Sequence, residues 1–233
     1  NACIIRDEDD CVCRTKVAKG DKLYTIAYGN PCAVHVDPIE KKPLYHFYPG
    51  TKAFSIATAG CVLACLNCQN WNIAQASPKK TSNYNLPPDR VLAQAKRYKC
   101  KSIAYTYSEP IAFYEYTLDT SILASQEGIK NILVTSGFIN KAPLKKWCKY
   151  VDAANVDLKS FSEDVYLKLN AGELQPVLDA LKVMKDEGVW IEITNLVVPQ
   201  WTDNFEMIKK MSAWLVKNGF GSYPLHFSRF LPK

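Results

Sequence analysis

Three cysteines within eight residues constrain the fold of this chain more than any other feature. Cys61, Cys65 and Cys68 have the spacing C-x₃-C-x₂-C and follow the apolar run 53–58. We expect them on a loop at the C-terminal end of a strand, where α/β barrels build their active sites. Thiolates are the standard ligands of iron–sulfur centres. Because no further cysteine occurs before Cys100, the three thiols predict a [4Fe–4S] cluster with one iron open to a substrate or cofactor.

A zinc site and a disulfide framework are the two other uses of such thiols. Structural zinc needs four nitrogen or sulfur ligands, and no obvious fourth partner lies close to the three cysteines. A disulfide framework is disfavoured because nine cysteines are an odd number and the chain shows no signal peptide. The iron–sulfur interpretation is therefore favoured. A non-catalytic zinc-binding module remains the alternative from a different class of protein.

Composition and charge narrow the classes of partner. With 233 residues, 48% of them hydrophobic, the chain can build one sizeable core. Its apolar runs, such as 132–134, are far shorter than the roughly 20 residues that cross a bilayer. No membrane partner is expected. Because no secretory leader is visible, we expect a cytoplasmic location. The net charge of +6 reflects 29 Lys and Arg against 23 Asp and Glu. Because the lysines are scattered in pairs along expected helices, nucleic acid is not the expected partner. A basic surface can equally attract an acidic protein or an anionic substrate.

From residue 53 onward, strand-like and helix-like segments alternate. The expected strands are 53–58, 102–107, 131–137, 153–159, 190–198 and 223–228. The expected helices are 88–99, 110–127, 142–150, 162–186 and 203–218. Pro88 and Pro110 suit a first helical turn, and glycines stand where several helices should stop. Six strands joined by helical crossovers predict an α/β fold, a parallel sheet curved into a partial (β/α)₆ TIM-like barrel.

The first 50 residues are expected to form an extension to this barrel. Segment 21–36 alternates in a β-like way around a Gly-Asn-Pro turn at 29–31, which predicts a β-hairpin. Three further cysteines precede it: Cys3, Cys11 and Cys13. They can belong to an incomplete second metal site or to a reduced leader. The predicted division is an N-terminal extension at 1–50 and a barrel at 51–233.

If the barrel is formed, the C-terminal ends of its strands face one pocket. These ends are polar: Thr106-Tyr107-Ser108-Glu109-Pro110, Thr135-Ser136-Gly137, Asp157-Leu158-Lys159, Asn195-Leu196-Val197-Val198-Pro199 and His226-Phe227-Ser228-Arg229. Three of these strand ends also have a structural explanation. Glu109 can be an acid that favours a helix N-terminus. Asp157 and Lys159 point to the same face of a strand and can form a plain ion pair. His226 can be a hydrogen-bonded core histidine.

The cysteine spacing resembles the signature of the radical S-adenosylmethionine (radical SAM) superfamily, whose open iron chelates the amino and carboxylate groups of SAM. Residues 37–50, DPIEKKPLYHFYPG, and the Cys-Gln-Asn-Trp at 68–71 are similar to the radical SAM member of the AmmeMemoRadiSam group. That group is related to the pyruvate formate-lyase activating enzymes, and the similarity covers nearly the whole chain. The resembling family usually continues well past residue 233, so part of the C-terminal region is expected to be missing.

The resemblance implies roles for the strand ends in binding SAM. Tyr107, Ser108 and Glu109 resemble the Gly-Gly-Glu-Pro motif that holds the SAM amine, with both glycines replaced. Ser136 would approach the ribose or the carboxylate, and Lys159 would neutralise oxygens of the same groups. The remaining implied contacts are Asn195 and Val197 on the adenine side and His226 near SAM.

The resemblance also implies an activity, that of a radical SAM oxidoreductase of the activating-enzyme type. The reduced [4Fe–4S] cluster would cleave SAM to a 5′-deoxyadenosyl radical, which abstracts hydrogen from a substrate. An electron donor such as flavodoxin or ferredoxin is then a required partner. Likeness to the activating enzymes implies a glycine of a partner protein as the substrate, and a small molecule or another protein residue is the alternative. Gln69, Asn70 and Trp71 are placed to give the cluster hydrogen bonds and burial.

Overall fold

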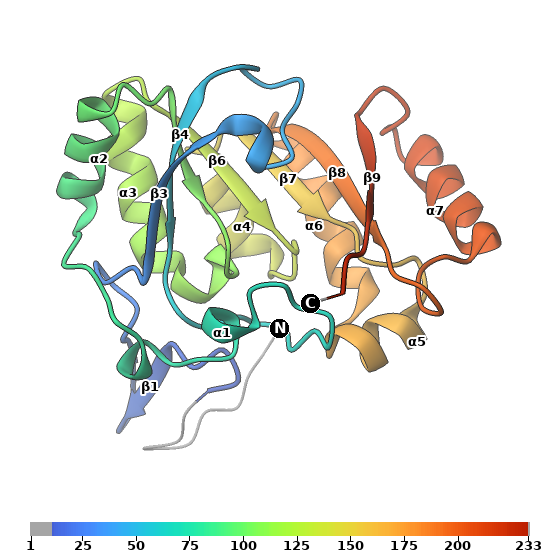
Figure 1. Ribbon diagram of the computed structural model, residues 1–233, viewed down its shortest axis with the longest axis horizontal. Coiled ribbons are helices and arrows are strands. Elements are labelled where there is room, and N and C mark those ends of the chain that lie inside the picture. The colour runs from blue at the N-terminus through green and yellow to red at the C-terminus, as the bar shows by residue number, and fades with distance from the viewer. Residues whose placement is uncertain (1–10, 233) are drawn as a thin grey trace.

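The structure is a computed structural model, and it describes residues 11–232. Within them, one seven-stranded sheet forms the centre of the molecule (Figure 1). Its strands, in spatial order, are β3 (Ala33–Pro38), β4 (Lys52–Ala57), β5 (Ser102–Tyr105), β6 (Lys130–Thr135), β7 (Ala153–Asp157), β8 (Trp190–Val197) and β9 (Leu225–Arg229). Strands β4 to β9 are parallel, and β3 is antiparallel to β4. All six predicted barrel strands are therefore confirmed.

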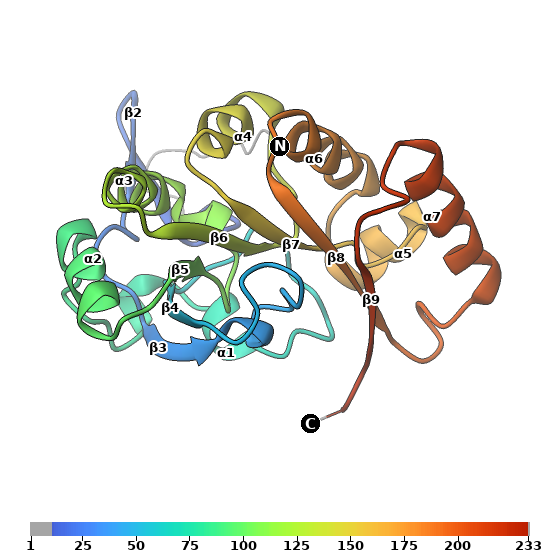
Figure 2. The same ribbon diagram turned by 90° about the horizontal axis from the view of Figure 1, so that it is seen from above.

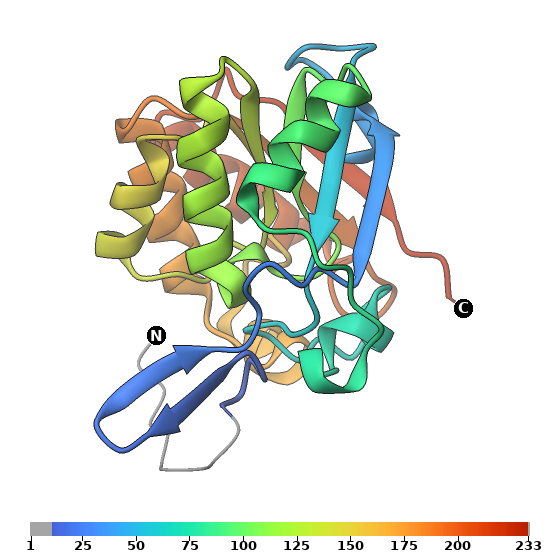
Figure 3. The same ribbon diagram turned by 90° about the vertical axis from the view of Figure 1, so that its left-hand side faces the viewer.

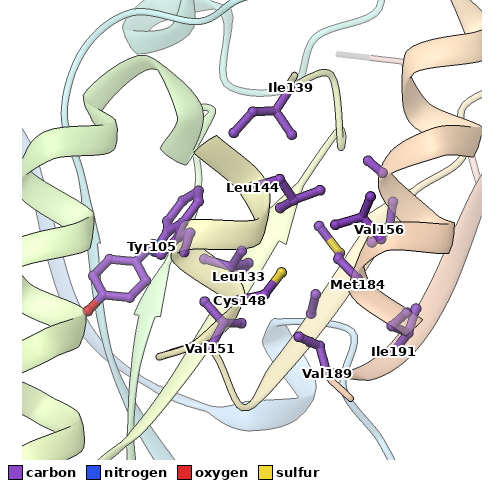
Figure 4. Close-up of a cluster of buried hydrophobic side chains, with 14 of the residues drawn as sticks. Tyr105, Leu133, Ile139, Leu144, Cys148, Val151, Val156, Met184, Val189 and Ile191 are labelled. Atoms are coloured by element: carbon purple, nitrogen blue, oxygen red, sulfur yellow. The ribbon is translucent and has the colours of Figure 1, made fainter. Parts of the chain in front are cut away.

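Helices cover the outer face of this sheet. Figure 2 shows the strands as an arc with the longer helices on its outer side. These are α2 (Pro88–Arg97), α3 (Tyr114–Gln126), α4 (Lys141–Cys148), α6 (Leu174–Asp186) and α7 (Phe205–Lys217). Apolar side chains of the strands and helices fill the layer between them, including Leu133, Leu144 and Ile191 (Figure 4). The predicted partial barrel is confirmed. In the described chain, no helix is long and apolar enough to cross a membrane.

The expected helix 162–186 is broken into two parts. The short α5 (Glu163–Val165) runs into a π-helical turn (Tyr166–Asn170), and α6 starts four residues later. Between them, Ala171 has a φ of 54° in the left-handed region. The break frees backbone carbonyls of the π-turn, which accept hydrogen bonds from the loop that carries the three cysteines. This long-range contact overrides the helical pattern of the sequence.

An N-terminal hairpin is present, but it uses other residues than the expected 21–36. Strands β1 (Lys16–Lys19) and β2 (Lys22–Thr25) pair around Gly20 and Asp21. The hairpin projects from the body at the same end as α1 (Trp71–Ala74) (Figure 3). Segment 33–36 instead lies in β3, at the edge of the large sheet. The division of the chain at residue 50 stays a prediction.

Residues 39–51, here called the interior loop, connect β3 to β4 across the N-terminal ends of the parallel strands. Ile39 and Leu44 are buried in a small apolar cluster with residues of β4 to β7. Farther across the sheet, Asn155 Nδ2 donates to Pro43 O at 3.0 Å. The carboxylate of Glu192 accepts from the backbone of the same loop. The loop therefore occupies the N-terminal end of the barrel, and the C-terminal end is left for a site.

Candidate functional site

The three cysteines lie on the cysteine loop (residues 58–70), between β4 and α1 at the C-terminal end of the sheet. Gly60 precedes them with a φ of 102°, and a Cβ there would lie 2.3 Å from Cys13 O. Only glycine fits this position. Beyond it, Ala64 N donates to Asn170 O at 3.1 Å and Leu66 N to Leu169 O at 2.9 Å. The loop is thus held against both the N-terminal segment and the π-turn.

The arrangement of these thiols decides between the alternative uses. Every cysteine that the structure describes is free, so a disulfide framework is wrong for residues 11–232. In that range, the only group of three or more His, Cys, Asp or Glu side chains with ligand atoms all within 4.8 Å is His46, Glu192 and His226. Sulfurs around a tetrahedral zinc ion lie about 3.8 Å apart. As placed, the three sulfurs are not all within 4.8 Å of one another, which is wider than the spacing in one zinc site, whereas a cluster ligates each thiol through a different iron.

Burial favours the protonated form of two of the three thiols, Cys61 and Cys68. Burial raises the pKa of Cys61 to about 12, and the Glu109 carboxylate adds to the effect. Burial also raises the pKa of the Cys68 thiol. Cys65 accepts a hydrogen bond from Asn170 Nδ2 at 3.3 Å. Metal-ligating thiols must lose their protons, so loading this loop with a metal centre releases protons.

Glu109 lies opposite the cysteine loop, at the end of β5. Its side chain is buried and accepts hydrogen bonds from Thr135 Oγ1 at 2.6 Å and from Ser136 N at 2.8 Å. Burial raises the pKa of Glu109, and these hydrogen bonds oppose the shift. The carboxylate also accepts from Ile111 N at 3.4 Å, as a cap of the turn Pro110–Phe113. The structure thus joins the ends of β5 and β6, as the sequence predicts.

Tyr107 occupies a backbone conformation that glycine adopts without strain, since its φ is 65°. Its carbonyl accepts from Asn70 Nδ2 at 2.8 Å, which ties the end of β5 to the cysteine loop. Its hydroxyl donates to the carboxylate of Asp37, beside the buried ammonium group of Lys42. The neighbouring Ser108 Oγ donates to Thr58 O at 2.6 Å. At Tyr107, the position of the first glycine of a Gly-Gly motif, the backbone thus has a conformation that favours glycine, while the Tyr107 ring reaches into the barrel.

Lys159 brings a positive charge to the same end of the sheet. Its Nζ lies 3.0 Å from Asp157 Oδ2, so the simple ion pair is present. Burial lowers the pKa of Lys159, but the Asp157 carboxylate and Cys65 outweigh it and raise the pKa above its ordinary value. Asn195 Nδ2 donates to Leu158 O at 2.8 Å and to Lys159 O at 3.3 Å. Val197, the last residue of β8, is half-buried.

His226 has different neighbours from the other predicted site residues. Its Nε2 lies 2.7 Å from Glu192 Oε2, and its ring contacts those of Tyr45 and His46. These partners belong to β8 and the interior loop, not to the cysteine loop. Of the two interpretations of His226, a hydrogen-bonded core histidine or a residue near SAM, the structure supports the first. A contact of His226 with SAM stays a prediction.

One residue of the site escaped sequence-based prediction, and one was assigned the wrong environment. Asn170 is almost fully buried and donates to the Cys65 sulfur from 105 residues away. Nothing in the local sequence marks it. Trp71, expected to bury the cluster, is 64% exposed. Asn70 donates through its side chain to Tyr107 O, and its backbone hydrogen-bonds the Cys68 thiol, as expected of a residue that supports the cluster ligands.

Comparison with known proteins identifies the class. The profile of the Radical SAM superfamily matches residues 55–212, a stretch that includes the cysteine loop and the ends of β4 to β8. The chain therefore belongs to the radical SAM superfamily. Members of this superfamily use a [4Fe–4S] cluster and S-adenosylmethionine.

Two particular relatives are similar in sequence. The chain is 41% identical over 230 residues to "Uncharacterized protein MJ0808" of Methanocaldococcus jannaschii, a match that covers 99% of this chain and 68% of the relative. It is 26% identical over 168 residues to the pyruvate formate-lyase-activating enzyme of Clostridium pasteurianum, covering 68% of this chain and 67% of that enzyme. The resemblance to radical SAM proteins and to activating enzymes is confirmed. The narrower AmmeMemoRadiSam resemblance stays a prediction.

Among solved structures, Streptococcus suis SuiB bound to S-adenosylmethionine has a similar fold. The TM-score is 0.58 at 17% identity, over 74% of this chain. SuiB bound to its precursor peptide SuiA gives a TM-score of 0.57 at 16% identity. The chain spans only 39% of the length of SuiB in the first comparison. The likeness shows the shared barrel and leaves the substrate open.

Proposed function

We propose that Cys61, Cys65 and Cys68 hold the cluster of this radical SAM protein, and that the ends of β5 to β8 bind SAM beside it. The main support is that Glu109 and Lys159 lie near the cysteine loop. The charges of these two side chains both act on the Cys61 thiol. The thiols are unpaired and spread wider than one metal ion requires. When bound, the cluster and SAM supply a 5′-deoxyadenosyl radical, which abstracts hydrogen from the substrate.

The protein groups have distinct parts in holding the nucleoside. The Glu109 carboxylate is fixed by its two partners on β6 and can accept charge-assisted hydrogen bonds from the SAM ammonium group. Lys159 can balance the SAM carboxylate or ribose oxygens. The Oδ1 atom of Asn195 is buried and has no hydrogen-bond partner within the described residues. It can accept from an amino group on the adenine side, next to Val197. Tyr107, Ser108 and Ser136 hold the ends of their strands in place.

The Glu109→Gln variant is expected to bind SAM about 10–100-fold more weakly, because it replaces a charged acceptor by a neutral one of the same shape. The iron content should stay unchanged, since no thiol is altered. Isothermal titration of cluster-loaded protein measures the affinity. Glu115→Gln is the matched control, because Glu115 lies exposed at the start of α3 and pairs with Lys16. Equal affinities in wild type and Glu109→Gln would remove Glu109 from the site.

For the substrate, we propose a glycine of a partner protein. The support is the sequence similarity to pyruvate formate-lyase-activating enzymes and the fold similarity to SuiB, which has been solved with a precursor peptide. Seven strands in an arc leave β3 and β9 unpaired with each other, so the barrel does not close. An open side can admit a loop of another protein. The interior loop restricts such a segment to the C-terminal half of the barrel.

An anaerobic assay with SAM, a chemical reductant and candidate glycine-containing partner proteins tests this proposal. The expected result is an organic radical on the partner, together with one 5′-deoxyadenosine per radical formed. A partner whose target glycine carries deuterium should pass the label into 5′-deoxyadenosine. Label transfer from a small molecule or from another residue type would overturn the glycine assignment, while leaving SAM cleavage itself intact.

The proposed chemistry also requires an electron donor. Reductive cleavage consumes one electron, which flavodoxin or ferredoxin would supply. The net charge of +6 suits an acidic donor of this kind. The described cysteines are all free thiols, as is usual in a reducing compartment, so a cytoplasmic location is part of the proposal.

A further inference from the structure

Three potential metal ligands converge at the opposite end of the barrel from the cysteine loop. His46 belongs to the interior loop, Glu192 to the first half of β8, and His226 to β9. His226 Nε2 lies 2.7 Å from Glu192 Oε2, and His46 Nδ1 lies 3.3 Å from the same oxygen. The ligand atoms of all three residues lie within 4.8 Å of one another. The proposed SAM chemistry uses neither Glu192 nor His46.

These separations match a first coordination shell. Ligands about 2.0–2.1 Å from a zinc ion lie roughly 3.0–3.4 Å from one another in neighbouring positions. The 3.3 Å separation of His46 Nδ1 from Glu192 Oε2 lies within that range, and the 2.7 Å separation of His226 Nε2 from the same oxygen lies just below it. A small rotation of the exposed His46 ring, together with a slight lengthening of the His226–Glu192 contact, would therefore place three donors around one ion.

The surroundings of Glu192 resemble the outer shell of a metal site. Its side chain is fully buried, and Oε1 accepts from His46 N at 2.8 Å and from Trp190 Nε1 at 3.3 Å. Tyr45 N donates to Oε2 at 3.0 Å. Such hydrogen bonds fix the orientation of a ligating carboxylate. The Tyr45 ring, 5.0 Å from that of His226 between centroids, fixes the second imidazole.

Access from solvent is provided by one ligand. The His46 side chain is 57% exposed, against 20% for His226. An ion at this position can be exchanged, and it keeps coordination positions open to water. Two imidazoles and one carboxylate form a set that binds borderline divalent transition metals, Zn²⁺ above all in a His₂Glu arrangement.

We propose that His46, Glu192 and His226 form a binding site for one divalent transition-metal ion, which ties the interior loop to β8 and β9. This site is separate from the cluster and goes beyond the proposed SAM chemistry. An ion that joins three distant parts of the chain stabilises the folded state, because the unfolded chain does not assemble these ligands.

Zinc content of cluster-loaded protein tests the site. Protein is incubated anaerobically with Zn²⁺ and desalted, and zinc per chain is measured together with the thermal midpoint. The wild-type protein should retain one more equivalent of zinc per chain than the His46→Ala or His226→Ala variant. Zinc should raise the thermal midpoint of the wild-type protein and leave that of the two variants unchanged. Because the chain has three histidines, His35→Ala on β3 is the matched control and should behave as wild type.

His46→Ala decides the outcome if the half-buried His226 variant does not fold, because the His46 side chain is mostly exposed. Zinc bound at the remaining cysteines is common to all variants and cancels in the comparison. Zinc K-edge absorption should assign nitrogen and oxygen ligands to the equivalent that His46→Ala loses. Equal zinc content in wild type and His46→Ala, or sulfur ligands on that equivalent, would overturn the proposal.

Discussion

Replacing Cys65 by alanine is expected to abolish the iron–sulfur centre, and with it all measurable production of 5′-deoxyadenosine. Cys65 is one of three thiols in a loop that offers no fourth, so its loss leaves only two protein ligands for a cluster. Iron content and absorption near about 400 nm of anaerobically reconstituted protein check the result. The variant should still fold, because Cys65 is only half-buried.

A matched substitution separates loss of a ligand from general damage. Cys100 is a free, buried cysteine after α2, outside the cysteine loop. The Cys100→Ala variant should keep its iron, its colour and its SAM cleavage. If Cys65→Ala kept them as well, the assignment of the cluster ligands would be wrong.

Replacing Asp37 by alanine is expected to reduce the free energy of unfolding by about 3–5 kcal/mol, the usual cost of leaving one member of a buried ion pair alone. The ammonium group of Lys42 lies 2.7 Å from Asp37 Oδ2, and the two side chains are 1% and 8% exposed. Lys42 also packs its charge 4.4 Å from the centre of the Tyr107 ring. The variant leaves this charge buried without its carboxylate. Denaturant unfolding of anaerobically purified protein measures the loss.

Two further variants isolate the cause of that loss. Lys41 also contacts Asp37, at 3.3 Å, but its side chain is 70% exposed. Lys41→Ala should change the unfolding free energy by less than about 1 kcal/mol. The double variant Asp37→Leu, Lys42→Met removes both charges and should recover most of the stability. If it were no more stable than Asp37→Ala, the buried charge would not be the cause.

The pH dependence of this pair has a defined sign. Burial raises the pKa of Asp37, but hydrogen bonds from Lys42 and Tyr107 outweigh it and hold the pKa below its ordinary value of 3.8. A depressed carboxyl pKa contributes stability above the unfolded-state value, and this contribution is lost as the pH falls below it. The stability difference between wild type and Asp37→Ala should therefore shrink at pH values below about 4.

Local patterns predict the barrel well because its elements satisfy local rules. Strand β6 contains the apolar run 132–134, and prolines stand in the first turns of α2 and of the segment before α3. The cysteine spacing locates the site because all three ligands lie on one loop. The polar strand ends then follow from the parallel topology, which places Glu109 and Lys159 at the same edge.

The features that failed prediction depend on contacts distant in sequence. Alternation in 21–36 fits a hairpin as well as it fits an edge strand, and pairing with β4 decides the outcome. The break at Ala171 depends on backbone contacts with the cysteine loop more than 100 residues earlier. Likewise, His226 stands at a strand end in sequence, but its register opposite Thr194 places it beside Glu192 and the interior loop.

Electron paramagnetic resonance of the reduced, reconstituted protein tests the account most directly, with spectra recorded before and after addition of SAM. Three thiolates from Cys61, Cys65 and Cys68 leave one iron for SAM, so we predict about four irons per chain and a spectrum that changes when SAM is added. A spectrum that SAM leaves unaltered, or thiols found to hold zinc instead of iron, would contradict it.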